Sequence, residues 1–467
     1  MIPFAPITLE TKELFSKYAS TQVNNCDAAF ANIFCWQQTY HSLAAEVGGC
    51  LVIRYRVEGS SRVAYMLLAR EFTAPLLSRT VPLLEADARQ QGQTLRITGL
   101  PSEAMEIMRS LFGDRFACSA SRDSADYLYN AADLRELPGR KYQPKRNHIN
   151  RFNDFYSYTY EPLAAAHKEE CMQLESLWQS HHRDDDGSTA AERMAIERAF
   201  DNFGALGLSG GLLRIDGRPA AFTYGSPVND RTFVVHVEKA DTSFEGIFPA
   251  INRLFAQSVP AQYEFINREE DMGLDGLRRS KLSYHPVALE YKHTALELDD
   301  DDRQVRRLWS EVFGDERSFI DKFLTDRELY GVLTLLRKAG EEVVAMLHIV
   351  PMADDGGNRH AYIYAVATDP RYRRHGLATA LMNEALAIAK GSFDTALLIP
   401  GDDYARQFYA RLGFVDTGLQ AEFASEFDFG TGDPSKNRVM ALSFSQLALT
   451  RPLVLTPLPN PGKESCR

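Results

Sequence analysis

The clearest change of hydrophobic pattern along the chain lies in AYIYAVATDPRYRRHGLATALMNEALAIAK, residues 361–390. Its first part is a β-rich run that ends at Thr368, and its last part has apolar residues at helical spacing. The pattern predicts a strand, a loop and a helix. Upstream, residues 330–350 are rich in Val, Leu and Ile around a polar turn at residues 338–342. We therefore expect two antiparallel strands before the strand that carries the loop.

Two helices are expected before these strands, and three further elements after the loop and helix. Apolar residues recur at helical spacing in DDDRQVRRLWSEVFG and in ERSFIDKFLTD, which predicts the two helices. Downstream, DTALLIPG is typical of a short buried strand, DYARQFYARLG of a helix that ends at Gly413, and NRVMALSF of a last strand. These elements define a predicted domain over residues 295–446.

The boundary of this domain is placed near Ala295, because the acidic run ELDDDD follows the strand-like piece VALEYKH there. Residues 1–294 mix predicted helices at 164–179 and 190–202 with strand pairs such as GGLLRIDGRPAAFTYGSPV, a second α/β pattern. Residues 447–467 are rich in Pro and lack periodicity, so we expect an extended strap or a disordered tail. The predicted fold class is α/β (α+β), with mixed sheets flanked by helices.

Composition and charge fit a globular protein of two or three domains. Hydrophobic residues make up 45% and charged residues 25% of the 467 residues. The formal net charge of −11 disfavours a general nucleic-acid coat, which needs many Lys and Arg contacts to phosphates. No stretch reaches about 20 apolar residues, and no basic segment precedes an apolar run at the N-terminus. We therefore expect no integral membrane segment and a cytoplasmic protein.

The cysteines indicate neither a disulfide frame nor a metal site, because there is no CxxC pair and no Cys/His cluster at metal spacing. We interpret them as buried free thiols and predict no metal cofactor. The six are Cys26, Cys35, Cys50, Cys118, Cys171 and Cys466.

The loop RRHGLA, residues 373–378, is a candidate site for a pyrophosphate. A helix N-terminus after a tight loop offers backbone N–H groups and a favourable dipole to such an anion. Gly376 permits close approach of the backbone, the small side chain of Ala378 leaves room for phosphates, and Thr379 can add a hydroxyl. An ordinary strand-to-helix turn is the alternative. The candidate cofactor-binding residues are Ala367, Thr368, Arg373, Arg374, His375, Gly376, Leu377, Ala378 and Thr379.

TDPRYRRHGLA, residues 368–378, resembles the central motif of the GNAT acyltransferases, V-x-P-x-Y-R-x-x-G-x-G/A, with Thr in place of the leading Val. The resemblance covers about residues 297–445 and includes FYARLGF, residues 408–414, which matches the helix-to-strand signature of that family. It implies acetyl-CoA or another acyl-CoA as donor and an amine as acceptor. It also implies that Tyr409 is a general acid for the leaving thiolate. The alternative interpretation of Tyr409 is an aromatic side chain packed between helix and sheet.

The general base that many GNAT enzymes carry has no counterpart in this sequence. These enzymes keep a Glu on the strand before the loop, and that place falls on Tyr364. His348 and Asp369 are the nearest titratable substitutes, although His348 lies in the apolar run LHIV and would equally suit a core histidine. The amine could instead arrive neutral or lose its proton to water.

Two charged stretches stand out before residue 295: GRKYQPKRNHINRF at residues 139–152 and FINREEDMGLDGLRRSKLSYHP at residues 265–286. A basic cluster suits a phosphate-bearing partner such as an acyl-CoA, a lipid head group or the acceptor end of tRNA, and a solvated charged face is the alternative. With NNCDAAFANIFCW and HVEKADTSFEGIFPAIN, these stretches resemble a bacterial family of unknown function over about residues 1–292. That family is related to the C-terminal domain of phosphatidylglycerol lysyltransferases.

This second resemblance implies two GNAT-like halves that divide near residue 150, and transfer of aminoacyl groups from tRNA to a lipid or another amine. It implies a polar site, for which structural ion pairing of Glu269 or Glu270 with Arg278, Arg279 or Lys281 is the alternative. The candidates for this second site are Lys145, Arg146, Glu238, Asn252, Arg268, Glu269 and Lys281.

Three hypotheses follow from the sequence. The first is an acyltransferase that moves an acetyl or other acyl group from acyl-CoA to a small-molecule or peptide amine, with the N-terminal part selecting the acceptor. The second makes the N-terminal part an aminoacyltransferase that uses aminoacyl-tRNA and acts on a lipid or peptide amine. The third is a non-catalytic acyl-CoA sensor, which the missing Glu would permit.

Overall fold

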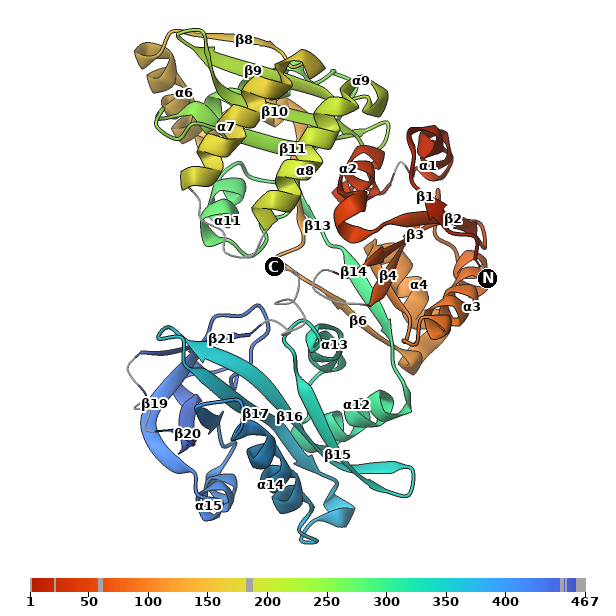
Figure 1. The fold of residues 1–467 in the computed structure, drawn as a ribbon, viewed down its shortest axis with the longest axis vertical. Coiled ribbons are helices and arrows are strands. Elements are labelled where there is room, and N and C mark those ends of the chain that lie inside the picture. The colour runs from red at the N-terminus through yellow and green to blue at the C-terminus, as the bar shows by residue number, and fades with distance from the viewer. Residues whose placement is uncertain are drawn as a thin grey trace. The chain divides into compact units, whose positions relative to one another are not determined.

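The computed structural model describes residues 2–20, 22–57, 62–181, 188–445, 449 and 452–458 (Figure 1). Contacts between residues divide it into two compact units. Unit 1 comprises Met1–Leu111 and Ala120–Thr294, and unit 2 comprises Phe112–Ser119 and Ala295–Arg467. The described residues form three mixed sheets flanked by helices, which confirms the predicted α/β (α+β) class.

The first sheet of unit 1 begins with five strands in the order β1-β2-β3-β4-β5. Pairing is antiparallel between β2, β3 and β4, and parallel between β4 and β5. The strands are β1 (Ala5–Pro6), β2 (Leu43–Val47), β3 (Cys50–Arg56), β4 (Val63–Leu68) and β5 (Arg96–Leu100). The helices of this part are α1 (Lys12–Tyr18), α2 (Phe30–Tyr40), α3 (Ala74–Gln90) and α4 (Ser102–Phe112).

The second sheet of unit 1 has the order β13-β7-β12-β11-β10-β9-β8. Its strands are β7 (Asp126–Asn130), β8 (Tyr158–Pro162), β9 (Ser209–Ile215), β10 (Arg218–Pro227), β11 (Thr232–Ala240), β12 (Phe265–Asn267) and β13 (Ala288–Glu290). Its helices are α5 (Ala131–Glu136), α6 (Gln143–Phe155), α7 (Lys168–His181), α8 (Ser188–Asp201), α9 (Phe203–Leu206), α10 (Ile247–Ser258) and α11 (Asp275–Leu282). The helices predicted at residues 164–179 and 190–202 correspond to α7 and α8. Residue 150 lies inside α6.

The register of β10 against β11 shifts between Tyr224 and Gly225, which pair with Val237 and Val235. His236 is therefore an extra residue on β11, a β-bulge that turns its side chain out of the regular alternation. Such a bulge changes the direction in which a side chain points, and here it places His236 between the polar side chains of Ser226 and Glu269.

The sheet of unit 2 has the order β15-β16-β17-β18-β20-β19-β21, and β21 also pairs with β16. Its strands are β15 (Leu333–Ala339), β16 (Glu342–Asp354), β17 (Arg359–Thr368), β18 (Thr395–Leu398), β19 (Val415–Phe423), β20 (Arg438–Ser443) and β21 (Leu453–Pro457). Its helices are α12 (Asp300–Phe313), α13 (Arg317–Asp326), α14 (Leu377–Ala389) and α15 (Asp403–Arg411). Two further strands, β6 (Phe116–Ala120) and β14 (His293–Glu297), are hydrogen-bonded neighbours.

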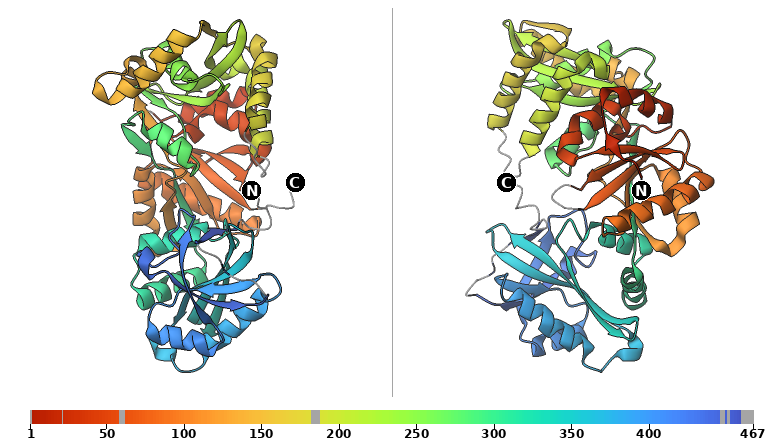
Figure 2. Two further views of the ribbon diagram at one scale, coloured as in Figure 1. Left: turned by 90° about the vertical axis from the view of Figure 1, so that its left-hand side faces the viewer. Right: turned by 45° about the vertical axis from the view of Figure 1, so that its right-hand side comes forward.

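Helices cover both faces of the sheet of unit 2 (Figures 1 and 2). On β16, Leu347 and Ile349 pack in one cluster with Leu381 and Met382 of α14. Other β16 side chains, including Met346, pack in a second cluster with α12 and α13. Because side chains alternate along a strand, β16 supplies core to both layers. Its neighbour β17 ends at Thr368 and leads into the loop before α14.

Two strands of unit 2 depart from the sequence prediction. β19 was not predicted, because its residues alternate between exposed and buried without a continuous apolar run. β21 lies in the segment predicted to be a strap or a disordered tail, and it pairs with β16 and β19. The last nine residues, 459–467, including Cys466, lie outside the described residues.

Candidate functional site

The loop before α14 has the geometry that an anion site at a helix N-terminus requires. Arg374 and Gly376 have positive φ values of 65° and 77°, and Gly376 is the N-cap of α14. The first helical hydrogen bond that starts at this cap runs from the Ala380 N–H to the Gly376 carbonyl, at 2.9 Å. The N–H groups of Leu377, Ala378 and Thr379 therefore precede it and are open to a ligand.

The nine predicted cofactor-binding residues lie along one path from the end of β17 into the first turn of α14. Ala367 is buried and Thr368 half-buried, and the other seven of these residues are exposed or half-buried. The His375 Nδ1 atom lies 2.9 Å from the carbonyl oxygen of Arg373, and the Arg373 Nε–H donates to the Thr368 carbonyl at 3.4 Å. These bonds brace the loop from within, and contact of its residues with a cofactor stays a prediction.

β17 is paired on only one side over its second half. It pairs with β18 in parallel at His360, Ala361 and Tyr362, while its pairing with β16 continues to Thr368. The register between β16 and β17 also shifts, and Ala365 has a positive φ of 48° in that stretch. Because the strands part after Tyr362, the backbone groups of residues 363–368 on the β18 side have no strand partner among the described residues.

Tyr409 lies on α15 and is 8% exposed. Its ring contacts those of Phe408 and Phe414, and it belongs to the same core cluster as Leu381 and Met382 of α14. Burial raises the pKa of the Tyr409 hydroxyl, so it keeps its proton at neutral pH. The side chain is packed between helix and sheet, as the alternative interpretation had it, and its role as a general acid stays a prediction.

His348 is a fully buried side chain of β16. Its Nδ1 atom lies 2.9 Å from the Thr334 hydroxyl, and its ring lies against Trp309 and Phe323. Burial lowers the pKa of His348 to about 3. The imidazole is therefore neutral but a weak proton acceptor.

The two other positions considered for a general base, Tyr364 and Asp369, also offer no unpaired carboxylate. Tyr364 lies in an aromatic cluster with Trp309, Phe323, Phe427 and Phe429. Asp369 forms an ion pair with Arg371 at 2.7 Å, and this hydrogen-bonded guanidinium lowers the pKa of the Asp369 carboxyl.

Four of the seven second-site candidates in unit 1 lie together. The Arg268 Nη2 atom lies 3.1 Å from a Glu238 oxygen, and the Asn252 amide donates to the other Glu238 oxygen at 3.2 Å. The Lys145 ammonium lies 4.0 Å from the centre of the Tyr284 ring, and the Arg268 guanidinium lies 5.0 Å from it. We call Lys145, Glu238, Asn252, Arg268 and Tyr284 the Tyr284 site.

The other three candidates make different contacts. Arg146 donates to the carbonyls of Leu137 and Gly139. The Lys281 ammonium donates to the carbonyls of residues 268, 269 and 270, at 2.6, 3.1 and 2.5 Å. Glu269, which has a positive φ of 56°, lies 2.9 Å from the His236 Nδ1 atom.

The His236 ring extends this contact into a buried chain. Its Nε2 atom lies 2.8 Å from the Ser226 hydroxyl, while its Nδ1 atom faces Glu269. Ser226 is 2% exposed, so this end of the chain is buried. The next residue, Pro227, has no backbone N–H and therefore offers no hydrogen-bond donor to a ligand. The hydrogen-bonded chain therefore fixes the bulged strand β11 against the loop after β12.

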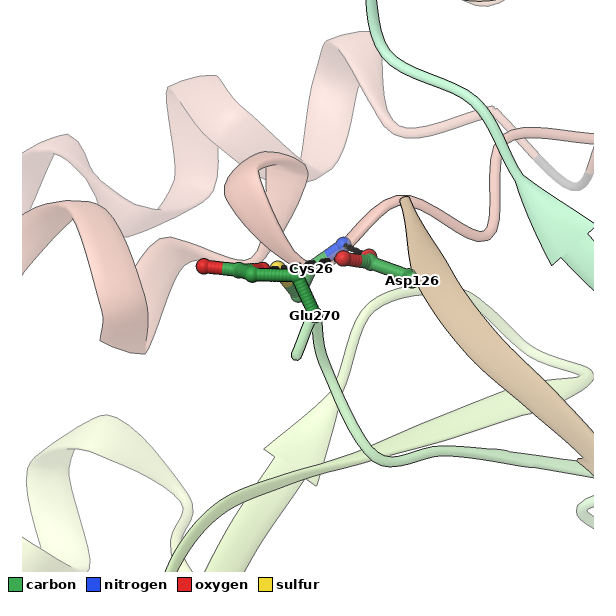
Figure 3. Close-up of side chains that lie close together, drawn as sticks. All are labelled: Cys26, Asp126 and Glu270. Atoms are coloured by element: carbon green, nitrogen blue, oxygen red, sulfur yellow. Dashed lines mark hydrogen bonds between the residues drawn. The ribbon is translucent and has the colours of Figure 1, made fainter. Parts of the chain in front are cut away.

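A second cluster in unit 1 contains the buried Cys26 and Asp126 and the half-buried Glu270 (Figure 3). Their ligand atoms lie within 4.8 Å of one another, the spacing of a possible metal site among the described residues. The Lys292 ammonium lies 2.9 Å from Asp126, 2.9 Å from Glu270 and 3.3 Å from the Cys26 sulfur. Lys292 thus supplies the positive charge of this cluster.

Asp126 and Glu270 share this ammonium with the more exposed Asp27, whose carboxylate lies 3.4 Å from it, and the pKa values of Asp126 and Glu270 separate. Burial raises the pKa of the Asp126 carboxyl to about 7. Burial also acts to raise the pKa of Glu270, but the Lys292 ammonium outweighs it and lowers that pKa to about 2. At neutral pH the Glu270 carboxylate is therefore ionised against Lys292.

Glu270 and Arg278, which were considered from the sequence as members of an ion pair, each pair with other residues in the structure. Arg278 pairs with Asp271 at 2.8 Å and with Asp123 at 2.5 Å, while Glu270 pairs with Lys292. The sequence did not point to four further residues of these clusters: Lys292, Asp126, His236 and Tyr284. Their contacts join segments up to 266 positions apart, and no local motif signals such a contact.

Two family models match the chain. The model for the C-terminal domain of phosphatidylglycerol lysyltransferase matches residues 18–296, and the model for the GNAT acetyltransferase family matches residues 295–414. The chain belongs to the phosphatidylglycerol lysyltransferase C-terminal family. Its remaining part carries a GNAT domain, so both resemblances seen in the sequence are confirmed, and the chain is an acyltransferase in the broad sense.

Solved structures add a relative of moderate identity. A conserved protein of unknown function from Bacteroides thetaiotaomicron is 38% identical, with a TM-score of 0.60, over 64% of this chain and 100% of that chain. The C-terminal domain of a putative lysylphosphatidylglycerol synthetase from Agrobacterium fabrum is 14% identical, with a TM-score of 0.46, over 64% of this chain and 93% of that chain. L-PGS from Bacillus licheniformis is 14% identical, with a TM-score of 0.46, over 61% of this chain and 91% of that chain. A search of curated proteins gave no match.

None of the helices formed by the described residues combines the length and the apolar character that crossing a membrane demands.

Proposed function

We propose that unit 2 binds acyl-CoA and transfers its acyl group, acetyl in the simplest case, to an amine, and that unit 1 selects the acceptor. The observation that carries the donor assignment is the start of α14. There the N–H groups of Leu377, Ala378 and Thr379 precede the first helical bond, beside the exposed Arg373 and Arg374. Backbone N–H groups, the helix dipole and two guanidinium groups together suit the pyrophosphate of CoA.

The parted strands β17 and β18 support the same donor. The pantetheine arm of CoA carries amide groups, and amides pair with a strand edge as another strand would. Residues 363–368 offer such an edge, which leads from the loop before α14 toward the middle of the sheet. The thioester at the end of the arm would then lie in the interior of the domain, away from the phosphates.

The deprotonation step is proposed to use water or an amine that is already neutral. Tyr364 holds the place of the usual carboxylate, and His348, with a pKa of about 3, is a weak base. Only the neutral amine has a lone pair for attack on the thioester. We expect the rate of acyl transfer to rise with pH until the acceptor amine is fully neutral. The pH–rate profile should lack the additional rise that an enzyme base with a pKa of about 6 to 7 would cause.

Replacing Ala378 by Glu is expected to weaken acetyl-CoA binding at least about tenfold. The new carboxylate would lie beside the pyrophosphate at the helix N-terminus, where it both fills space and repels the ligand. Isothermal titration calorimetry with acetyl-CoA and with free CoA measures the effect. Ala387→Glu is the matched control, because Ala387 is an exposed alanine near the other end of α14.

Equal acetyl-CoA affinities of Ala378→Glu and Ala387→Glu would contradict the donor site. Release of free thiol with a panel of small-molecule and peptide amines then separates an enzyme from a sensor. A protein that binds acetyl-CoA but releases no thiol with any amine would be the non-catalytic sensor that the missing Glu permits.

A second candidate function is aminoacyl transfer from tRNA by unit 1. It is supported by the family match over residues 18–296 and by the buried charges of the Tyr284 site within that range. Incubation with radiolabelled lysyl- or alanyl-tRNA and a mixture of lipid and peptide amines tests it. Hydrolysis of the ester without any aminoacylated product would count against this function.

A further inference from the structure

The Tyr284 site brings two cations and one carboxylate together in the interior of unit 1. Lys145 lies on α6, Glu238 on β11, Asn252 on α10, and Arg268 directly after β12. Tyr284 and Asn252 are buried, and the side chains of Arg268 and Glu238 are 12% and 13% exposed. Lys145 is half-buried against the Tyr284 ring and forms no ion pair with a carboxylate of the described residues.

The hydrogen bonds of the site leave one donor and one acceptor unused. Arg268 Nη2 and the Asn252 amide nitrogen occupy the two oxygens of Glu238. Because a carboxylate only accepts, this bond fixes the orientation of the Asn252 amide, so its Oδ1 atom points elsewhere. Both Asn252 Oδ1 and Arg268 Nη1 are buried without a hydrogen-bond partner. Unpaired buried polar atoms are uncommon in native proteins, and a ligand is one of the few causes.

The charges of the site are also incompletely balanced, because two cations face one carboxylate. Glu238 forms an ion pair with Arg268 but not with Lys145, on which its charge acts less than the repulsion of Arg268 does; Lys145 lies against the Tyr284 ring. Burial and this repulsion lower the pKa of Lys145 to about 8. The neighbouring Lys281 is different, since three backbone carbonyls surround its ammonium. One negative charge would balance the Tyr284 site.

We propose that the Tyr284 site binds an oxyanion group that also carries an N–H or O–H donor. The anionic oxygen accepts from Arg268 Nη1 and from the Lys145 ammonium, and the donor bonds to Asn252 Oδ1. A carboxylate beside an amine, as in an α-amino acid, and a protonated phosphate both have this chemistry. The inference goes beyond the proposed acyl-CoA function, because it concerns unit 1 alone.

Labelling of Lys145 by trace acetic anhydride measures occupancy of the site. The reagent attacks only neutral amines, so a bound oxyanion, which holds the ammonium charged, protects Lys145. Glycine and inorganic phosphate are the two probes, added separately to the full chain at constant ionic strength and pH 8, where phosphate is mainly the dianion that keeps one O–H donor. Mass spectrometry gives the ratio of modified Lys145 to modified Lys141. Lys141 is an internal reference, because it also lies over a tyrosine ring but has Asp133 as its counter-charge.

We expect at least one probe to lower this ratio about tenfold at saturation. Protection by glycine alone identifies a carboxylate with its amine, protection by phosphate alone identifies a phosphate, and protection by both identifies the shared oxyanion chemistry. Both probes are used at about 50 mM, a concentration at which even weak single-group sites fill. A labelling ratio that neither probe changes would overturn the proposal.

Two variants test the binding groups by calorimetry with the same probes. Arg268→Lys keeps a cation for Glu238 but removes the second guanidinium nitrogen, and Lys145→Gln removes the ammonium. Each is expected to weaken probe binding at least about tenfold, while Lys141→Gln leaves it within twofold. Circular dichroism melting checks that each variant folds, and Lys145→Gln is at a half-buried position that should tolerate the change. Undiminished binding by both variants would contradict the assignment.

Discussion

Replacing Lys292 by methionine is expected to lower the free energy of unfolding of unit 1 by about 3–5 kcal/mol. The Lys292 side chain is 8% exposed, and its ammonium lies 2.9 Å from both Asp126 and Glu270. Methionine fills similar space but leaves Asp126 and Glu270, together with the more exposed Asp27, without their cation. The loss is large because an unpaired buried charge keeps its full desolvation cost.

The pH dependence of this loss has a definite sign. Without Lys292, burial raises the folded-state pKa of the Asp126 and Glu270 carboxyl groups above their unfolded values. A carboxyl group of that kind lowers the stability of the folded protein as the pH rises through its folded-state pKa, and it has no such effect below its unfolded-state pKa. The deficit of Lys292→Met relative to the wild type should therefore be largest above about pH 7 and should shrink toward pH 5.

Urea unfolding read by hydrogen exchange of peptides from unit 1 measures the effect separately from unit 2. Lys17→Met is the matched control, since the Lys17–Glu46 pair is exposed and should change stability far less. The double variant Lys292→Met with Glu270→Gln should regain part of the loss, because it removes one uncompensated charge. Equal effects of Lys292→Met and Lys17→Met would show that the cluster does not depend on its ammonium.

The sequence predicted the elements of unit 2 that have a strong local pattern. The two helices at residues 300–314 and 316–326, the strand ending at Thr368 and the helix after it all have continuous periodicity, and the structure confirms them. β19 and β21 were missed, because β19 alternates irregularly and β21 is held by pairing with β16 and β19 rather than by its own pattern. Tertiary pairing decides such strands.

Prediction of the sites follows the same division. The loop at residues 373–378 is contiguous, so its position at the start of α14 could be read from the chain. The Tyr284 site was predicted in part, since Lys145, Glu238, Asn252 and Arg268 were named through the family resemblance. Tyr284 was not, because its ring joins two of these cations only in the folded unit. The Lys292 cluster has no local signal at all.

Replacing Tyr409 by phenylalanine is expected to lower kcat about a hundredfold and to leave acetyl-CoA affinity nearly unchanged. In acyl transfer the amine nitrogen bonds to the thioester carbon, the C–S bond breaks, and the sulfur leaves as a thiolate that takes up a proton. A positioned acid contributes roughly 10²- to 10⁴-fold to such a step. Burial raises the pKa of Tyr409, which makes it a poor acid relative to a thiol and favours the low end of this range.

The measurement is steady-state thiol release with an amine acceptor found in the screen, together with calorimetry of acetyl-CoA binding. Phe408→Leu is a useful comparison, because Phe408 is the neighbouring aromatic residue, contacts the Tyr409 ring and carries no hydroxyl. If Tyr409 acts through its hydroxyl, Tyr409→Phe slows turnover while Phe408→Leu does not. A fully active Tyr409→Phe enzyme would instead leave Tyr409 as a core aromatic between α15 and the sheet. Leaving-group protonation would then fall to water, as amine deprotonation does in the proposed mechanism.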